Sequence, residues 1–182
     1  MLRALGVACL LVLPAAAERA AARPILWAGG GYGGIEELTT CEAVEGSSCD
    51  QAAADGPAFP VGLGIELAAN RWFAVQAGVR LLTVLNATQD SWGLAASGLG
   101  ALRLTPGPAI LEFGTGLAWL RASGWGHDFA ATAGLLHLAV GGRISDRWRV
   151  LGVLEVMPGD GSIGGFIGGM LEIALGRGGS PQ

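Results

Sequence analysis

The sequence predicts an all-β fold, an eight-stranded antiparallel up-and-down transmembrane β-barrel. Hydrophobic residues make up 51% of the chain, yet beyond its first segment no run of about 18 apolar residues is unbroken, as a membrane-spanning helix would require. From Pro24 onward, apolar residues alternate with small or polar ones, which is the period of a β-strand. Turn-forming residues divide this alternation into eight segments, an even number that lets an antiparallel sheet close on itself.

The first residues have the pattern of an export signal. Arg3 precedes an apolar run that is too short to cross a bilayer, and this run leads into an A-x-A cleavage pattern at Ala15-Ala16-Ala17. We therefore expect a signal peptide over 1–17, followed by a short tail over 18–24.

Cys9 leaves an alternative open for this leader. In a lipoprotein signal it would be the acylated residue, but Gly6-Val7-Ala8 makes a poor lipobox and leaves almost no apolar stretch before it. Simple removal of the leader is the preferred interpretation.

The barrel is predicted over 25–177, with a C-terminal tail over 178–182. Its eight segments are 25–33, 60–68, 72–84, 92–104, 109–121, 129–144, 148–157 and 162–176. The second, fourth and sixth links are short, whereas the first loop, 34–59, is the longest connection. Short turns at one end and long loops at the other are typical of membrane barrels.

The alternation also predicts which face is outside. In the third segment Phe73, Val79 and Leu81 share one face, and Gln76 and Arg80 share the other. Eight strands enclose an interior only wide enough for side chains. We therefore expect Gly, Ala, Ser and scattered charges inside and bulky apolar residues against lipid. A soluble lipocalin-like barrel would need the reverse assignment.

Nine ionisable side chains fall on the predicted inner face. They are Glu66, Arg80, Arg103, Glu112, His137, Arg143, Arg149, Glu155 and Glu172. The preferred interpretation is a lumen plugged by mutually neutralising charges, because little room is left for a pore. The alternative is a selective polar lumen or a proton-linked site.

Turn lengths predict partners within this set. A three-residue turn at 145–147 would place His137 opposite Glu155. A four-residue turn at 105–108 would place Arg103 diagonally from Glu112. Both are expected to be ion or hydrogen-bond pairs.

The first loop contains Cys41 and Cys49, an even number of cysteines in a chain predicted to be exported, so a disulfide is expected there. The loop is acidic and lacks EF-hand spacing, so no metal site is expected, although acidic loops could bind divalent cations that bridge lipopolysaccharide. Its acidic residues are Glu36, Glu37, Glu42, Glu45, Asp50 and Asp55.

Catalytic, cofactor and nucleic-acid functions have little support in the sequence. The formal net charge is −4, which disfavours nucleic acid, and no cofactor motif is present. A lipid-modifying enzyme would need Ser, His and a carboxylate near the outer rim. Ser123, His127 and Asp128 are the only such candidates, and no motif surrounds them, so we expect no catalytic residues.

Taken together, the leader, the eight alternating segments and the short and long links resemble the small bacterial outer-membrane barrels of the OmpA/OmpX and OmpW types. The resemblance implies an outer-membrane location, contact with lipid and lipopolysaccharide, and insertion by the outer-membrane assembly machinery. This sequence departs from those families at the C-terminus, because it ends Gly178-Gly179-Ser180-Pro181-Gln182 without the aromatic residue that usually ends their last strand.

This resemblance implies a non-catalytic monomer with a structural or surface-interaction role in the cell envelope. The OmpW resemblance implies the alternative, a narrow channel or binding barrel for small hydrophobic or ionic solutes. A lipid-modifying enzyme is the third class.

Overall fold

The computed structural model describes residues 22–37, 53–86, 91–124 and 127–175. The predicted signal peptide, the predicted disulfide between Cys41 and Cys49, and the C-terminal tail lie outside these residues. Within the described ranges, no helical segment has the length and apolar character needed to span a bilayer.

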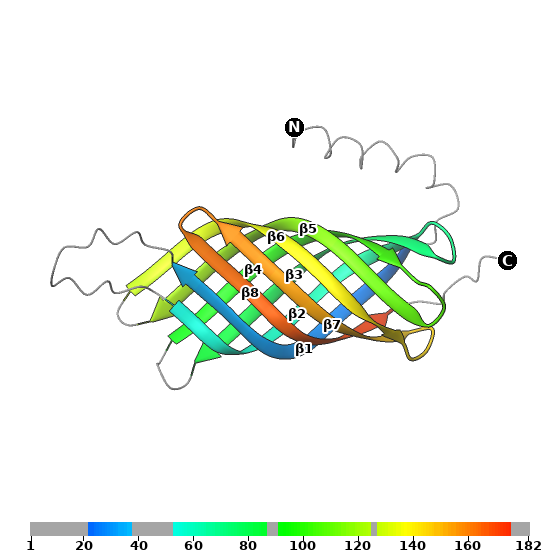
Figure 1. Cartoon of the computed structure of the whole chain (residues 1–182), viewed down its shortest axis with the longest axis horizontal. Helices are drawn as coiled ribbons and strands as arrows, with labels where there is room; N and C mark the ends of the chain where they lie inside the picture. The colour runs from blue at the N-terminus through cyan, green and yellow to red at the C-terminus, as the bar shows by residue number, and fades with distance from the viewer. Residues whose placement is uncertain (1–21, 38–52, 87–90, 125–126, 176–182) are drawn as a thin grey trace, which may run out of the picture.

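Eight antiparallel strands form one closed barrel, each paired with its neighbour in sequence and β8 paired with β1 (Figure 1). The strands are β1 (Ala22–Glu37), β2 (Ala53–Ala68), β3 (Phe73–Asn86), β4 (Ser91–Leu104), β5 (Ala109–Gly124), β6 (His127–Arg143), β7 (Trp148–Gly159) and β8 (Ser162–Ala174). This confirms the predicted fold class. We call the end where β1 finishes and β2 begins the loop end, and the opposite end, with the short links, the turn end.

The strands are strongly staggered around the barrel. Following the residue pairs once around from Trp27 leads back to β1 at Glu37, ten residues farther along the same strand. Such a stagger tilts the strands by about 40° from the barrel axis and sets a narrow interior.

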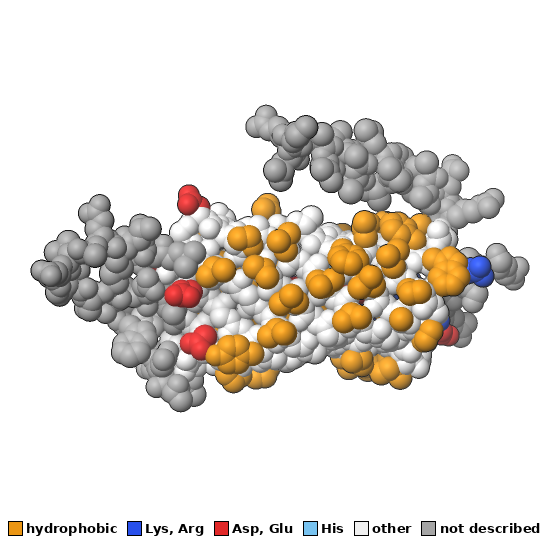
Figure 2. Space-filling model, in the orientation of Figure 1, with side chains coloured by type: hydrophobic (Ala, Val, Ile, Leu, Met, Phe, Trp, Pro, Cys, Tyr) orange, Lys and Arg blue, Asp and Glu red, His pale blue; other side chains and the backbone are white. Residues whose placement is uncertain are grey.

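The side chains on the outer and inner faces of the barrel wall are those that the alternation predicts. Val79 and Leu117 are 56% and 75% exposed on the outside, whereas Glu112 and Glu172 are completely buried inside. Figure 2 shows apolar side chains spread over the wall between the two ends, with acidic side chains gathered at the loop end. Bulky apolar residues therefore cover the outside of the wall, and away from the two ends of the barrel the ionic residues face inward.

The predicted first loop, 34–59, is wrong in its bounds, because β1 continues to Glu37 and β2 begins at Ala53. In the added part of β2, Ala54 and Ala58 are buried while Asp55 is exposed. On the outer face here, Asp55 and Pro57 interrupt the hydrophobic alternation before Phe59, although the pairing with β1 continues.

The expectation of a small-residue interior with scattered charges is also incomplete. Large apolar side chains are fully buried, including Leu120, Leu135 and Met157. Trp27 fits because glycines lie beneath its ring: a Cβ on Gly64 or Gly78 would approach ring atoms of Trp27 to 2.4 or 2.5 Å. Where glycines lie beside a large residue, the interior has room for that side chain, which the number of strands alone does not predict.

Candidate functional site

The charged side chains predicted to face inward gather into one buried network in the turn half of the barrel. All are nine-tenths or more buried except Arg143. Arg143 has the inward alternation but ends β6 and is exposed, so the prediction that it belongs to the network is wrong. At the last residue of a strand the side chain reaches solvent instead of the interior.

Arg103 is the centre of the network. Its guanidinium forms ion pairs with Glu66, Glu112 and Glu172, which come from three other strands. With its amide oxygen turned toward Arg103, Gln76 accepts from Nη2 at 2.6 Å. One arginine thus forms ion pairs with carboxylates from β2, β5 and β8.

Arg149 holds two of the same carboxylates from the opposite side. Its Nη1 and Nη2 donate to Glu66 at 2.6 and 2.9 Å, and Nη1 also pairs with Glu172. The indole Nε1 of Trp27 donates to Glu172 at 2.9 Å. Glu66 and Glu172 are therefore shared between two arginines, which satisfies most of their acceptor positions.

A second group lies one layer nearer the loop end. Arg80 forms an ion pair with Glu155, and the ring Nδ1 of His137 lies 2.9 Å from the same carboxylate. His137 Nε2 lies 3.5 Å from Glu112, which links this group to the Arg103 centre. Arg80 also lies over the Trp27 ring, 5.0 Å from its centroid.

The charges of the buried network balance in one protonation state. Three arginines face four glutamates, so a protonated His137 between Glu112 and Glu155 makes the sum zero. Burying charge is tolerated only when each ion is paired. The network can be electrically neutral without any bound ion.

Every strand contributes to this network. Two members, Trp27 of β1 and Gln76 of β3, were not predicted from the sequence, because neither side chain is ionisable. Both have the inward alternation of their strands, so a search for any buried hydrogen-bonding group on that face would have found them.

The predicted pairs are present, one with a different register. His137 lies opposite Glu155, as the three-residue turn requires. Arg103 lies directly opposite Glu112 rather than diagonally, because Leu104 pairs with Leu111 instead of Ala109, so that the last pair of β4 and β5 encloses residues 105–110. Gly107 has a φ of 68° in that link, a left-handed conformation that glycine adopts without strain.

The rim residues considered for catalysis lie where β5 meets β6. Ser123 is opposite Asp128 and Gly124 is opposite His127, while the Asp128 carboxylate lies 3.8 Å from Arg121. The described residues contain no group of three or more His, Cys, Asp or Glu side chains arranged to hold a metal ion.

Comparison with known proteins gives similarity in structure only. No protein-family model matches the chain, and no curated protein is similar to it in sequence. The attachment invasion locus protein Ail of Yersinia pestis superposes with a TM-score of 0.55 at 12% identity, covering 83% of this chain and 98% of Ail. Neisserial surface protein A superposes with a TM-score of 0.55 at 11% identity, covering 84% of this chain and 98% of that protein.

The chain has the fold of the small outer-membrane β-barrels. The resemblance to the OmpA/OmpX type is thereby confirmed for the architecture, which both neighbours share with this chain over nearly their full lengths. At these identities the similarity concerns the fold alone.

Proposed function

We propose that this chain is a non-catalytic barrel of the bacterial outer membrane, closed inside by its own side chains, with a structural or surface-interaction role in the cell envelope. The observation that carries the proposal is the buried network, to which all eight strands contribute. Such a network ties the barrel wall together across its centre.

The outer surface supports insertion in lipid. Large apolar side chains exposed around the wall include Leu63 at 60%, Val140 at 61% and Ile167 at 62%. In water these residues would make an apolar surface of unusual extent, whereas in hydrocarbon they lower the free energy. Lipid, lipopolysaccharide and the assembly machinery are therefore the partners that we propose for a monomeric barrel.

A closed lumen is supported by the side chains on the loop side of the network. Leu120, Leu135, Met157 and Phe166 are each at least 98% buried there. A hydrated solute would have to pass both this apolar layer and the ion pairs. Since breaking a buried ion pair costs about 3–5 kcal/mol, we propose that the barrel does not conduct.

The surface role is supported by the loop end. Its described acidic residues are Glu36, Glu37, Asp55, Asp128 and Asp160, against one arginine, Arg121. The names of the two structural neighbours refer to attachment and to the cell surface. For this chain we propose contact at the loop end with partners of positive charge.

Two measurements test the proposal. Cell fractionation with a gel of unheated and heated protein should place the chain in the outer membrane and show a heat-modifiable band. Purified protein in planar bilayers should give no single-channel steps. Steady steps would overturn the closed lumen and favour a narrow channel, and absence from the outer membrane would overturn the location.

A further inference from the structure

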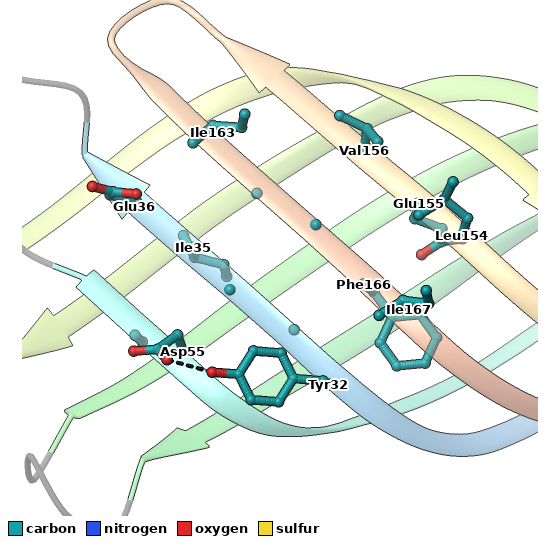
Figure 3. Close-up of a pocket in the computed structure, with 15 residues that line it drawn as sticks. Tyr32, Ile35, Glu36, Asp55, Leu154, Glu155, Val156, Ile163, Phe166 and Ile167 are labelled. Carbon is teal, nitrogen blue, oxygen red and sulfur yellow. Dashed lines mark hydrogen bonds between the residues drawn. The ribbon is translucent and has the colours of Figure 1, made fainter.

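The outer wall carries a hollow near the loop end. A groove of about 620 Å³ lies there across β1, β8 and β7 (Figure 3). At its centre Gly34 of β1 pairs with Gly165 of β8. Because both alternate outward and neither has a side chain, the floor of the groove is bare backbone.

Side chains from neighbouring positions form the walls. Tyr32 pairs with Ile167 on the turn side of the glycines, and Glu36 pairs with Ile163 on the loop side. Val156 of β7 lies opposite Gly165. In Figure 2 this region is a pale area bordered by apolar and acidic side chains.

The fold does not require glycine at position 34 of this floor, whereas a Cβ on Gly165 would make a tight contact, 3.3 Å from the backbone oxygen of Glu155. A Cβ on inward-facing Gly29 would lie 2.3 Å from the backbone oxygen of Gly169, so a side chain there is excluded. A Cβ on Gly34 would meet its nearest atom, the Cβ of Asp55, at 3.7 Å, an ordinary contact. At Gly34 the missing side chain therefore deepens the hollow on the outer surface and is not needed to avoid a clash with the backbone.

The groove has two chemically different sides. The β7 and β8 side is apolar, with Val156, Ile163 and Ile167 exposed by 37% to 62%. The β1 and β2 side holds Glu36 and Asp55, and Asp55 accepts a hydrogen bond of 2.5 Å from the Tyr32 hydroxyl. Among the ion pairs between described residues, none includes either carboxylate.

We propose that this groove binds one lipid of the leaflet at the loop end, with an acyl chain over Gly34 and Gly165 and an ammonium head group at Glu36 and Asp55. The proposal rests on the proposed function, since it requires this wall to face lipid. Hydrocarbon fills an apolar hollow that opens into a bilayer. Two carboxylates near the membrane surface attract a positive charge.

A second copy of the chain fits this surface less well. A two-fold symmetric contact places the same patch on both copies, so two hollows would face each other around the glycine pairs. A flexible chain fills such a hollow without this mismatch, and it leaves its head group beside the carboxylates.

Native mass spectrometry of the full chain, released from nanodiscs of phosphatidylethanolamine and phosphatidylglycerol, tests the inference. The parent should retain one phosphatidylethanolamine. Gly34→Leu fills the groove and should lower that retention about tenfold, since losing contact with about two methylene groups is enough for this factor. Gly98→Leu is the matched control, because a Cβ on this outward glycine of β4 meets nothing within 4 Å, and it should retain lipid like the parent.

The head-group contact is tested separately with Glu36→Gln combined with Asp55→Asn, which should remove the preference for phosphatidylethanolamine over phosphatidylglycerol. Equal retention by Gly34→Leu and the parent, a parent preference for phosphatidylglycerol, or a dimer without lipid would each overturn the inference. A heat-modifiability gel on every variant reports folding of the barrel. A folded parent that retains no lipid therefore refutes the groove alone, whereas failure to fold in lipid refutes the proposed function.

Discussion

Arg103 and Glu112 face each other directly across β4 and β5, with Nε of Arg103 2.6 Å from a carboxylate oxygen of Glu112. The same guanidinium pairs with Glu66 and Glu172. Since these four residues come from four strands of the barrel, stability should depend on Arg103 more than on any exposed arginine.

We expect Arg103→Met to lower the free energy of unfolding in lipid vesicles by about 3–5 kcal/mol, because three buried carboxylates lose a shared partner. Urea titration of the protein in vesicles, monitored by tryptophan fluorescence, measures this free energy of unfolding. Arg147→Gln, in the exposed link between β6 and β7, is the control and should change stability by less than about 0.5 kcal/mol. Equal effects of the two substitutions would mean that the network does not stabilise the barrel.

His137 and Glu155 should be energetically coupled. Because Nδ1 of His137 lies 2.9 Å from Glu155, the single variants His137→Leu and Glu155→Gln should not have additive effects. A double-mutant cycle of unfolding free energies should give a coupling of about 0.5–3 kcal/mol. Additivity would show that the contact contributes nothing.

If the wall of the barrel faces lipid, an arginine introduced in the middle of the bilayer should destabilise the barrel more than one introduced near the membrane surface. Leu117 in mid-strand and Ile144 in the turn are 75% and 70% exposed. In vesicles Leu117→Arg should destabilise the barrel by about 2–4 kcal/mol and Ile144→Arg by about 0–1 kcal/mol. A barrel whose wall faced water would show the same small effect at both positions.

Glycines on the two faces should respond differently to alanine. A Cβ on inward Gly116 would lie 1.9 Å from the backbone oxygen of Gly98, whereas one on outward Gly98 meets nothing within 4 Å. We expect Gly116→Ala to cost about 1–3 kcal/mol through overpacking, and Gly98→Ala to be nearly neutral. Equal stabilities in the urea titration would contradict the described packing.

Some features follow from short-range patterns in the sequence. Period-two alternation gave the strand number, the outward face of Val79 and Leu117, and the inward face of Glu112 and Glu172. Turn length at 145–147 gave the pairing of His137 with Glu155. These predictions succeeded because side-chain direction and hairpin register are local properties of the chain.

Other features depend on closure of the barrel, and the sequence by itself could not determine them. Arg103 meets Glu172 only because the first and last strands pair and the stagger brings distant residues to one height. Trp27 is buried because Gly64 and Gly78 lie beneath it on two other strands. The alternation of the chain therefore determined a membrane-type barrel with ionic groups inside, whereas the tertiary structure alone decided which groups meet, because those contacts depend on the shear of the closed sheet.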